Sequence, residues 1–223
     1  MLYFRGCTAR EKLTGIQDAT EKLLKLAGVD YHILDDEKCC GSVLLRTGFE
    51  EEAAEQINKN TEALMGEKIV TSCAGCFKTL TEDYEGLDVI HISQLLDSLI
   101  RQGKLDFNKK DLNVTYHDSC HLGRHMNVFD EPRDVIKAIA NLFEMENVRE
   151  DGLCCGAGGG VKSAYPEIAD EMAKIRISQA KDTGCEILLT SCPFCKLNLE
   201  NGDLEVLDLT EFLVRYGDVD EVQ

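Results

Sequence analysis

The stretch Leu153-Cys-Cys-Gly-Ala-Gly-Gly-Gly160 contains two adjacent cysteines followed by glycine, and the same Cys-Cys-Gly triplet occurs earlier, at residues 39–41. Each triplet is preceded by a lone cysteine and followed by a Cys-x-x-Cys turn. The spacings nearly repeat: 32 and 33 residues in the first half (7 to 39, 40 to 73), and 34 and 37 in the second (120 to 154, 155 to 192). The pattern therefore predicts two related modules that carry five of these cysteines each.

These cysteines are arranged for ligation rather than for packing. Thiolates are soft ligands, and five of them in each half indicate metal or redox chemistry. Adjacent cysteines in an extended segment point in opposite directions, so a Cys-Cys pair suits an extended cluster whose separate irons each take one sulfur. Gly41 and Gly156 follow the pairs and allow the backbone to approach a cluster, so we expect both to contribute to cofactor binding. Each Cys-x-x-Cys turn opens a predicted short helix, whose amides favour the thiolate form.

Zinc is the structural alternative. A single tetrahedral site could be formed by the four Cys-x-x-Cys cysteines, Cys73, Cys76, Cys192 and Cys195. That site would leave both Cys-Cys-Gly pairs and both lone cysteines without a role. Cys185 lies outside the repeat, and we expect it to be a buried, inert thiol.

The composition narrows the classes of function. Hydrophobic residues make up 43% of the 223 residues, enough for a sizeable core. With 24 basic and 41 acidic residues the net charge is −17, which disfavours nucleic acid and anionic membrane surfaces as partners. No run of eighteen apolar residues occurs, and the first residues, MLYFRGC, do not resemble a secretory signal. We therefore expect a cytoplasmic protein that meets a membrane only through a partner.

Strands and helices alternate in both halves of the sequence. The alternation predicts an α/β protein of two tandem, pseudo-twofold-related modules, with small, mostly parallel sheets and with the cysteine loops just past the carboxyl ends of the strands. We expect the modules to span residues 1–109 and 110–223, joined by the polar stretch 101–110. The predicted strands are residues 2–4, 31–34, 68–71, 88–92, 114–117, 186–190 and 204–207. The predicted helices are residues 13–26, 50–64, 94–100, 132–142, 166–180 and 211–216.

Histidines gather around the second lone cysteine, at His117, His121 and His125. Reduction of a substrate to a thiol requires an acid near the cluster, so His121 and His117 are candidate proton donors. The alternative is that they donate hydrogen bonds to loop carbonyls or to cluster sulfur.

Five segments carry a family resemblance: YFRGCTA (3–9), VTSCAGC (70–76), YHDSCH (116–121), LCCGAGGG (153–160) and TSCPFC (190–195). With them the chain resembles the CCG-domain (cysteine-rich domain) iron–sulfur proteins of the heterodisulfide reductase B/D family over essentially its whole length. The resemblance implies two noncubane [4Fe-4S] clusters with five cysteine ligands each. By motif, the first cluster would take Cys7, Cys39, Cys40, Cys73 and Cys76. The second would take Cys120, Cys154, Cys155, Cys192 and Cys195.

The resemblance also implies a reaction and its partners. In this family the disulfide of coenzymes M and B is reduced to two thiols between the clusters, and we expect that reaction, a related one or the reverse. The ferredoxin-type CxxCxxCxxxCP motifs of the family's D-type members are absent from this sequence, so electrons would come from a ferredoxin-like partner, with a flavin protein as a second expected partner. The alternative function is electron transfer within a glycolate, lactate or glycerol-3-phosphate dehydrogenase complex, without substrate chemistry of its own.

Overall fold

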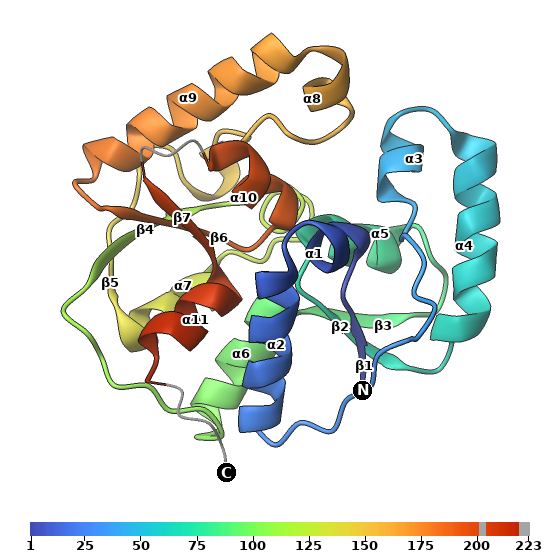
Figure 1. Cartoon of the computed structure of the whole chain (residues 1–223), viewed down its shortest axis with the longest axis horizontal. Helices are drawn as coiled ribbons and strands as arrows, with labels where there is room; N and C mark the ends of the chain where they lie inside the picture. The colour runs from blue at the N-terminus through green and yellow to red at the C-terminus, as the bar shows by residue number, and fades with distance from the viewer. Residues whose placement is uncertain (201–203, 219–223) are drawn as a thin grey trace.

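The computed structural model describes residues 1–200 and 204–218, whose strands form two small parallel sheets (Figure 1). The first sheet has the order β1-β2-β3 and the second the order β5-β4-β6-β7. All neighbouring strands in both sheets are parallel. The strands are β1 (Leu2–Phe4), β2 (Lys68–Thr71), β3 (Asp88–His91), β4 (Asn113–His117), β5 (Asn141–Leu142), β6 (Ile187–Thr190) and β7 (Glu205–Asp208). The predicted α/β class with two tandem modules is confirmed.

The helices connect the parallel strands and cover the sheets. The first half contains α1 (Cys7–Glu11), α2 (Thr14–Leu26), α3 (Ser42–Arg46), α4 (Glu50–Leu64), α5 (Ala74–Glu82) and α6 (Ile92–Arg101). The second half contains α7 (Asp130–Ile139), the 3₁₀ turn η1 (Arg149–Asp151), α8 (Val161–Ala164), α9 (Pro166–Asp182), α10 (Pro193–Leu199) and α11 (Leu209–Tyr216).

The two sheets are built alike. Strands β1, β2 and β3 correspond in order and direction to β4, β6 and β7. At the carboxyl end of the sheets, Phe4 of β1 lies beside Thr71 of β2, and His117 of β4 lies beside Thr190 of β6. His117 is therefore the counterpart of Phe4 in the second module.

A shared core joins the halves. Helix α2 packs against α11, α6 against α7, and α7 against α11, in the lower middle of Figure 1. The largest apolar cluster accordingly contains buried residues from both halves, among them Leu23, Leu99, Ile136 and Phe212. The sheets fall on either side of residue 109, but the core is continuous, so the division into 1–109 and 110–223 remains a prediction.

Two predicted elements differ from the structure. The predicted strand 31–34 is wrong, because it is reduced to one bridge between His32 and Leu2. Beyond that bridge the segment does not continue along β1. The Leu34 carbonyl instead accepts a hydrogen bond from the Arg5 side chain (2.9 Å). The predicted helix 132–142 ends earlier, at Ile139, because Asn141–Leu142 pairs with β4 as β5.

Four of the cysteine positions follow strands directly. Cys7 and Cys120 come three residues after β1 and β4, and Cys73 and Cys192 come two residues after β2 and β6. The Cys-Cys-Gly pairs instead follow irregular segments. Their loops are held by side chains that donate to the cysteine carbonyls: Asn60 to Cys39 (2.8 Å), Tyr84 to Cys40 (3.1 Å) and Asn198 to Cys155 (2.6 Å).

Candidate metal centre

One cavity brings together all ten repeated cysteines. It has a volume of about 120 Å³ and lies at the carboxyl edges of the two sheets. Its walls also include Arg46, Ser119 and His121, and the three consecutive glycines at residues 158–160. The lining cysteines are Cys7, Cys39, Cys40, Cys73, Cys76, Cys120, Cys154, Cys155, Cys192 and Cys195. The structure thus gathers the two sequence-predicted ligand sets into a single site.

The ten sulfurs form one continuous row of interacting thiols. The sulfur–sulfur separations along it include 3.9 Å for Cys7 and Cys39 and 3.3 Å for Cys155 and Cys195. The two halves meet where the Cys73 thiol interacts with Cys192. The order is Cys7, Cys39, Cys40, Cys76, Cys73, Cys192, Cys195, Cys155, Cys154, Cys120. The second half of the row is the first half in reverse, as a pseudo-twofold relation between the modules requires.

Hydrogen bonds between neighbouring thiols shift their pKa values along this row. Hydrogen bonds from Cys39 and Cys76 lower the pKa of Cys40, and hydrogen bonds from Cys195 and Cys73 lower that of Cys192. The hydrogen bond with Cys39 raises the pKa of Cys7. Thiolates therefore form readily at some positions of the row while their neighbours hold the protons. A metal that replaces these protons relieves the competition between neighbouring thiolates.

The two predicted cofactor-binding glycines lie beside sulfur. Their backbone amides donate to the first cysteine of each pair, Gly41 to Cys39 (3.5 Å) and Gly156 to Cys154 (3.4 Å). Both glycines have positive φ, 85° and 88°, so the left-handed backbone turns the amide toward the sulfur.

The two candidate histidine donors occupy different places. His121 lines the cavity, with Nδ1 3.4 Å from the Cys120 sulfur, and its ring contacts the exposed ring of His125 at a centroid distance of 5.2 Å. His117 is fully buried at the end of β4, behind the cysteines, and does not line the cavity. Burial lowers the pKa of both, and that of His117 to about 3.

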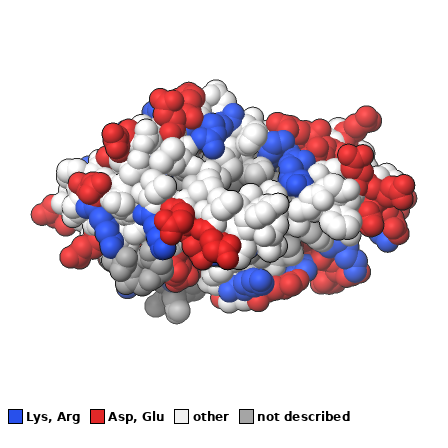
Figure 2. Space-filling view, turned by 90° about the horizontal axis from the view of Figure 1, so that it is seen from above, with Lys and Arg blue, Asp and Glu red and all other residues white. Residues whose placement is uncertain are grey.

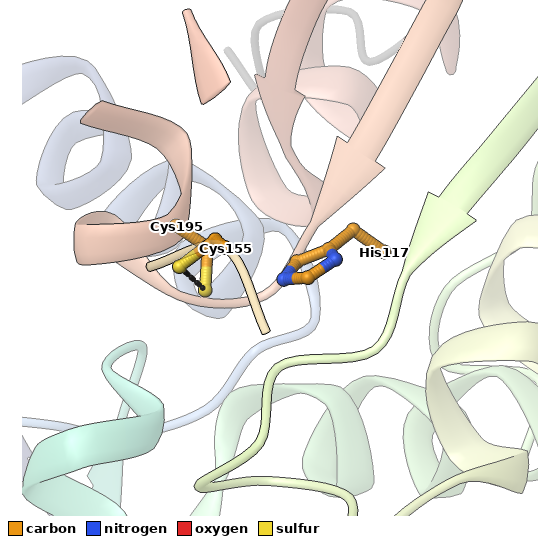
Figure 3. Close-up of side chains that lie close together, drawn as sticks. All are labelled: His117, Cys155 and Cys195. Atoms are coloured by element: carbon orange, nitrogen blue, oxygen red, sulfur yellow. Dashed lines mark hydrogen bonds between the residues drawn. The ribbon is translucent and has the colours of Figure 1, made fainter. Parts of the chain in front are cut away.

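His117 points at sulfur (Figure 3). Its ring extends from β4 toward Cys155 and Cys195, and one ring nitrogen lies within 4.8 Å of both sulfurs. Its Nδ1 accepts a hydrogen bond from Nε of Arg176 (2.9 Å), a residue of α9. His117 therefore contacts the second cysteine set from the protein side rather than from the cavity.

Iron–sulfur clusters fit this donor set. All eleven cysteines are free thiols, and the six at the centre of the row are buried while the four at its ends are partly exposed. Amides aimed at sulfur and a buried imidazole aimed at sulfur are the outer contacts that such clusters receive in proteins. Cys185 is buried and does not line the cavity, as predicted for an inert thiol.

The charge of the surface is uneven. Figure 2, seen from the side of α3 and α8, shows acidic side chains at both ends of this face and one acidic group beside a largely uncharged middle that carries a few basic side chains. Arg46, which lines the cavity, pairs with Asp83 at 3.0 Å.

Within residues 1–200 and 204–218, no helix combines the length and the apolar composition needed to cross a bilayer.

Several residues that shape the site were not predicted from the sequence. Buried Glu37 accepts the amides of Arg5 and Gly6, both at 2.9 Å, just before Cys7. Buried Asp118 accepts both terminal nitrogens of Arg133 (2.7 and 2.8 Å) and the Arg149 amide (2.8 Å). These carboxylates fix the loops that lead into the lone cysteines. Their partners are 15 to 32 residues away in sequence, so only the folded chain identifies them.

Comparisons with known proteins agree with this site. The cysteine-rich CCG domain family matches residues 1–81 and 114–200, which include all ten cavity cysteines. The chain is 40% identical to the D subunit of the dihydromethanophenazine:CoB–CoM heterodisulfide reductase of Methanosarcina acetivorans, over 94% of the chain and 57% of that protein. It is 34% identical to the B subunit of the fumarate reductase (CoM/CoB) of Methanothermobacter marburgensis, over 97% and 46%. It is 32% identical to the EtfAB:quinone oxidoreductase of Syntrophomonas wolfei, over 90% and 31%. The chain spans about half the length of the first two relatives.

Proposed function

The chain belongs to the cysteine-rich CCG domain family, and from this premise we propose that it is an iron–sulfur oxidoreductase subunit of the heterodisulfide reductase kind. The proposed reaction is reduction of a small disulfide to two thiols, or the reverse, with CoM-S-S-CoB or a related disulfide as substrate. The observation that carries the proposal is the row of ten interacting thiols in one cavity. A zinc site at the four central cysteines would use fewer than half of them.

The cysteines divide into two ligand sets about the contact between Cys73 and Cys192. The first set is Cys7, Cys39, Cys40, Cys73 and Cys76, and the second is Cys120, Cys154, Cys155, Cys192 and Cys195. When bound, two [4Fe-4S] clusters of the noncubane type would supply electrons one at a time. Reduction of a disulfide consumes two electrons and two protons and yields two thiols. A substrate in the shared cavity would meet both sets at once.

Protons have a route from the surface. The exposed ring of His125 contacts His121, and His121 lines the cavity beside Cys120. We assign His121 as the residue that delivers protons to the thiol products. Gly41 and Gly156 hold Cys39 and Cys154 through their amides.

Partners follow from the proposed chemistry. The electrons would come from a ferredoxin-like iron–sulfur subunit, with a flavin subunit as a further partner. The relatives are named as subunits of larger oxidoreductases, which supports a complex. We place this complex in the cytoplasm. Any contact with a membrane would be made by the partner subunits.

One relative favours a second candidate. The similarity to an EtfAB:quinone oxidoreductase supports an electron-transfer subunit without substrate chemistry of its own, as in glycolate, lactate or glycerol-3-phosphate dehydrogenase complexes. The two functions differ in whether both cysteine sets are needed for turnover.

The test is donor-driven reduction of a panel of disulfides by the anaerobically reconstituted chain, with Cys40→Ser and Cys155→Ser compared against wild type. Cluster content is measured in each variant by spectroscopy. Two-site disulfide reduction predicts that each variant keeps the other cluster yet loses turnover. Substantial activity from a variant with one cluster, or a fully loaded wild type that reduces no disulfide in the panel, would favour electron transfer instead.

A further inference from the structure

A buried arginine supports His117 without an acidic partner. Arg176 is completely buried, and its Nη1 donates to the Asn147 carbonyl and to Oε1 of Gln179, both at 2.8 Å. Its Nε donates to Nδ1 of His117, and its Nη2 has no hydrogen-bond partner among the described residues. No carboxylate within residues 1–200 and 204–218 forms a salt bridge with it; the nearby Asp118 is paired with Arg133. The guanidinium charge is thus left directed toward the imidazole.

This contact fixes the tautomer of His117. Because the Arg176 Nε–H donates to Nδ1, the neutral ring carries its proton on Nε2. Nε2 is buried and has no partner among the described residues. A buried donor without a partner destabilises the folded state, so the position calls for an acceptor. The nearest candidates are the sulfurs of Cys155 and Cys195, toward which the ring points (Figure 3).

The first module has no such pair. Phe4 occupies the position of His117 in the matching sheet. Asn60 occupies the position of Arg176: it lies seven residues after Ala53, whose carbonyl lies near Gly41, as Arg176 lies seven after Ala169, whose carbonyl lies near Gly156. Asn60 donates to the Cys39 carbonyl and to the Tyr84 hydroxyl and leaves no free charge. Both members of the pair therefore differ together between the modules.

We propose that Arg176 and His117 form a buried positioning relay that donates a hydrogen bond to the sulfurs of the second site and makes its cluster the more easily reduced of the two. This inference rests on the proposed function, since it concerns the two clusters. A donated hydrogen bond and a nearby positive charge stabilise the more negative, reduced form of a cluster. The first site, with Phe4 and Asn60, lacks both contributions. Electrons that reach the two clusters would then reside mainly on the cluster held by the second cysteine set.

The experiment measures reduction potentials, not turnover. EPR-monitored redox titrations are run on the chain with one cysteine set removed, either by Cys39→Ser with Cys40→Ser or by Cys154→Ser with Cys155→Ser. The relay predicts that the second cluster alone has the higher midpoint. In that background His117→Phe, which copies the first module, should lower the ratio of reduced to oxidised cluster at a fixed potential at least tenfold, a shift of about 59 mV for one electron. Arg176→Met should shift it in the same direction, and the two changes together should add little.

Controls separate this relay from structural and ligand roles. His117→Gln keeps an N–H at the end of the side chain and should restore most of the potential. In the chain that holds only the first cluster, His117→Phe should leave the midpoint potential unchanged. Equal midpoints for the two clusters, or an unchanged midpoint in His117→Phe and Arg176→Met, would overturn the relay while leaving the proposed function intact. Loss of iron from the second site in both His117→Phe and His117→Gln would make His117 a ligand and also overturn it. A wild-type chain that binds no cluster after reconstitution would instead contradict the proposed function itself.

Discussion

The thiols of Cys73 and Cys192 interact across the boundary between the two halves of the chain. Each is the N-cap of the helix that follows its central strand, α5 or α10, and each is buried. The carboxyl ends of β2 and β6 are therefore close together, and the ligand sets of both modules open into one cavity. Two metal centres in this arrangement would be neighbours rather than separate sites.

Removing one Cys-Cys pair should halve the metal content. We expect Cys39→Ser with Cys40→Ser to lower iron to about half of the wild-type value, because the second set, from Cys120 to Cys195, remains complete. The measurement is iron per chain after anaerobic reconstitution. Cys185→Ser is the matched control, since this thiol is buried outside the cavity and its loss should leave the iron content unchanged. Iron that stays at the wild-type level in the double variant would contradict the ligand assignment.

The two Cys-Cys-Gly glycines should differ in their tolerance of alanine. Both have a left-handed backbone, so either substitution costs about 1–2 kcal/mol of folding free energy. A Cβ at Gly41 would have no neighbour closer than 3.9 Å, whereas at Gly156 it would lie 2.8 Å from the Ala169 carbonyl oxygen. Gly156→Ala should therefore cost about 1–3 kcal/mol more than Gly41→Ala. Thermal unfolding of the two variants compares them, and equal losses would show that the close contact relaxes freely.

Stability should fall with rising pH through one buried carboxyl group. Burial raises the pKa of Asp208 to about 7, and its Oδ2 has no partner among the described residues. In the unfolded chain the carboxyl has a pKa of about 3.9. The folded state therefore holds the proton more tightly, so the stabilisation is complete below about pH 4 and is lost as the pH rises through 7.

Asp208→Asn removes this dependence. The amide oxygen can still accept from the Thr210 amide, so the N-cap of α11 is kept. Between pH 5 and pH 8 the wild type should lose on the order of 3 kcal/mol of unfolding free energy that the variant does not lose. Unfolding midpoints measured at both pH values give the difference. Exposed Asp106→Asn serves as control, and a wild-type curve parallel to that of Asp208→Asn would contradict the assignment.

The sequence was most informative where local pattern decides structure. The strand Lys68–Thr71 and the helix Glu50–Leu64 match their predicted limits, because a short run of β-branched residues marks the strand and helical periodicity marks the helix. The segment 31–34 failed because the Arg5 side chain, rather than β1, binds the Leu34 carbonyl. The cysteine repeat indicated two ligand sets, yet the contact between Cys73 and Cys192 depends on how the modules pack. The contact of buried His117 with Arg176, which lies 59 residues further along the chain, likewise depends on the folded structure.

The central claim is that both cysteine sets hold iron–sulfur clusters, and metal analysis of the intact chain tests it most directly. Protein purified or reconstituted without oxygen is assayed for iron, acid-labile sulfide and zinc per chain. Two [4Fe-4S] clusters predict about eight irons and eight sulfides per chain, with little zinc. About one zinc per chain without labile sulfide would contradict the account and identify Cys73, Cys76, Cys192 and Cys195 as a structural zinc site.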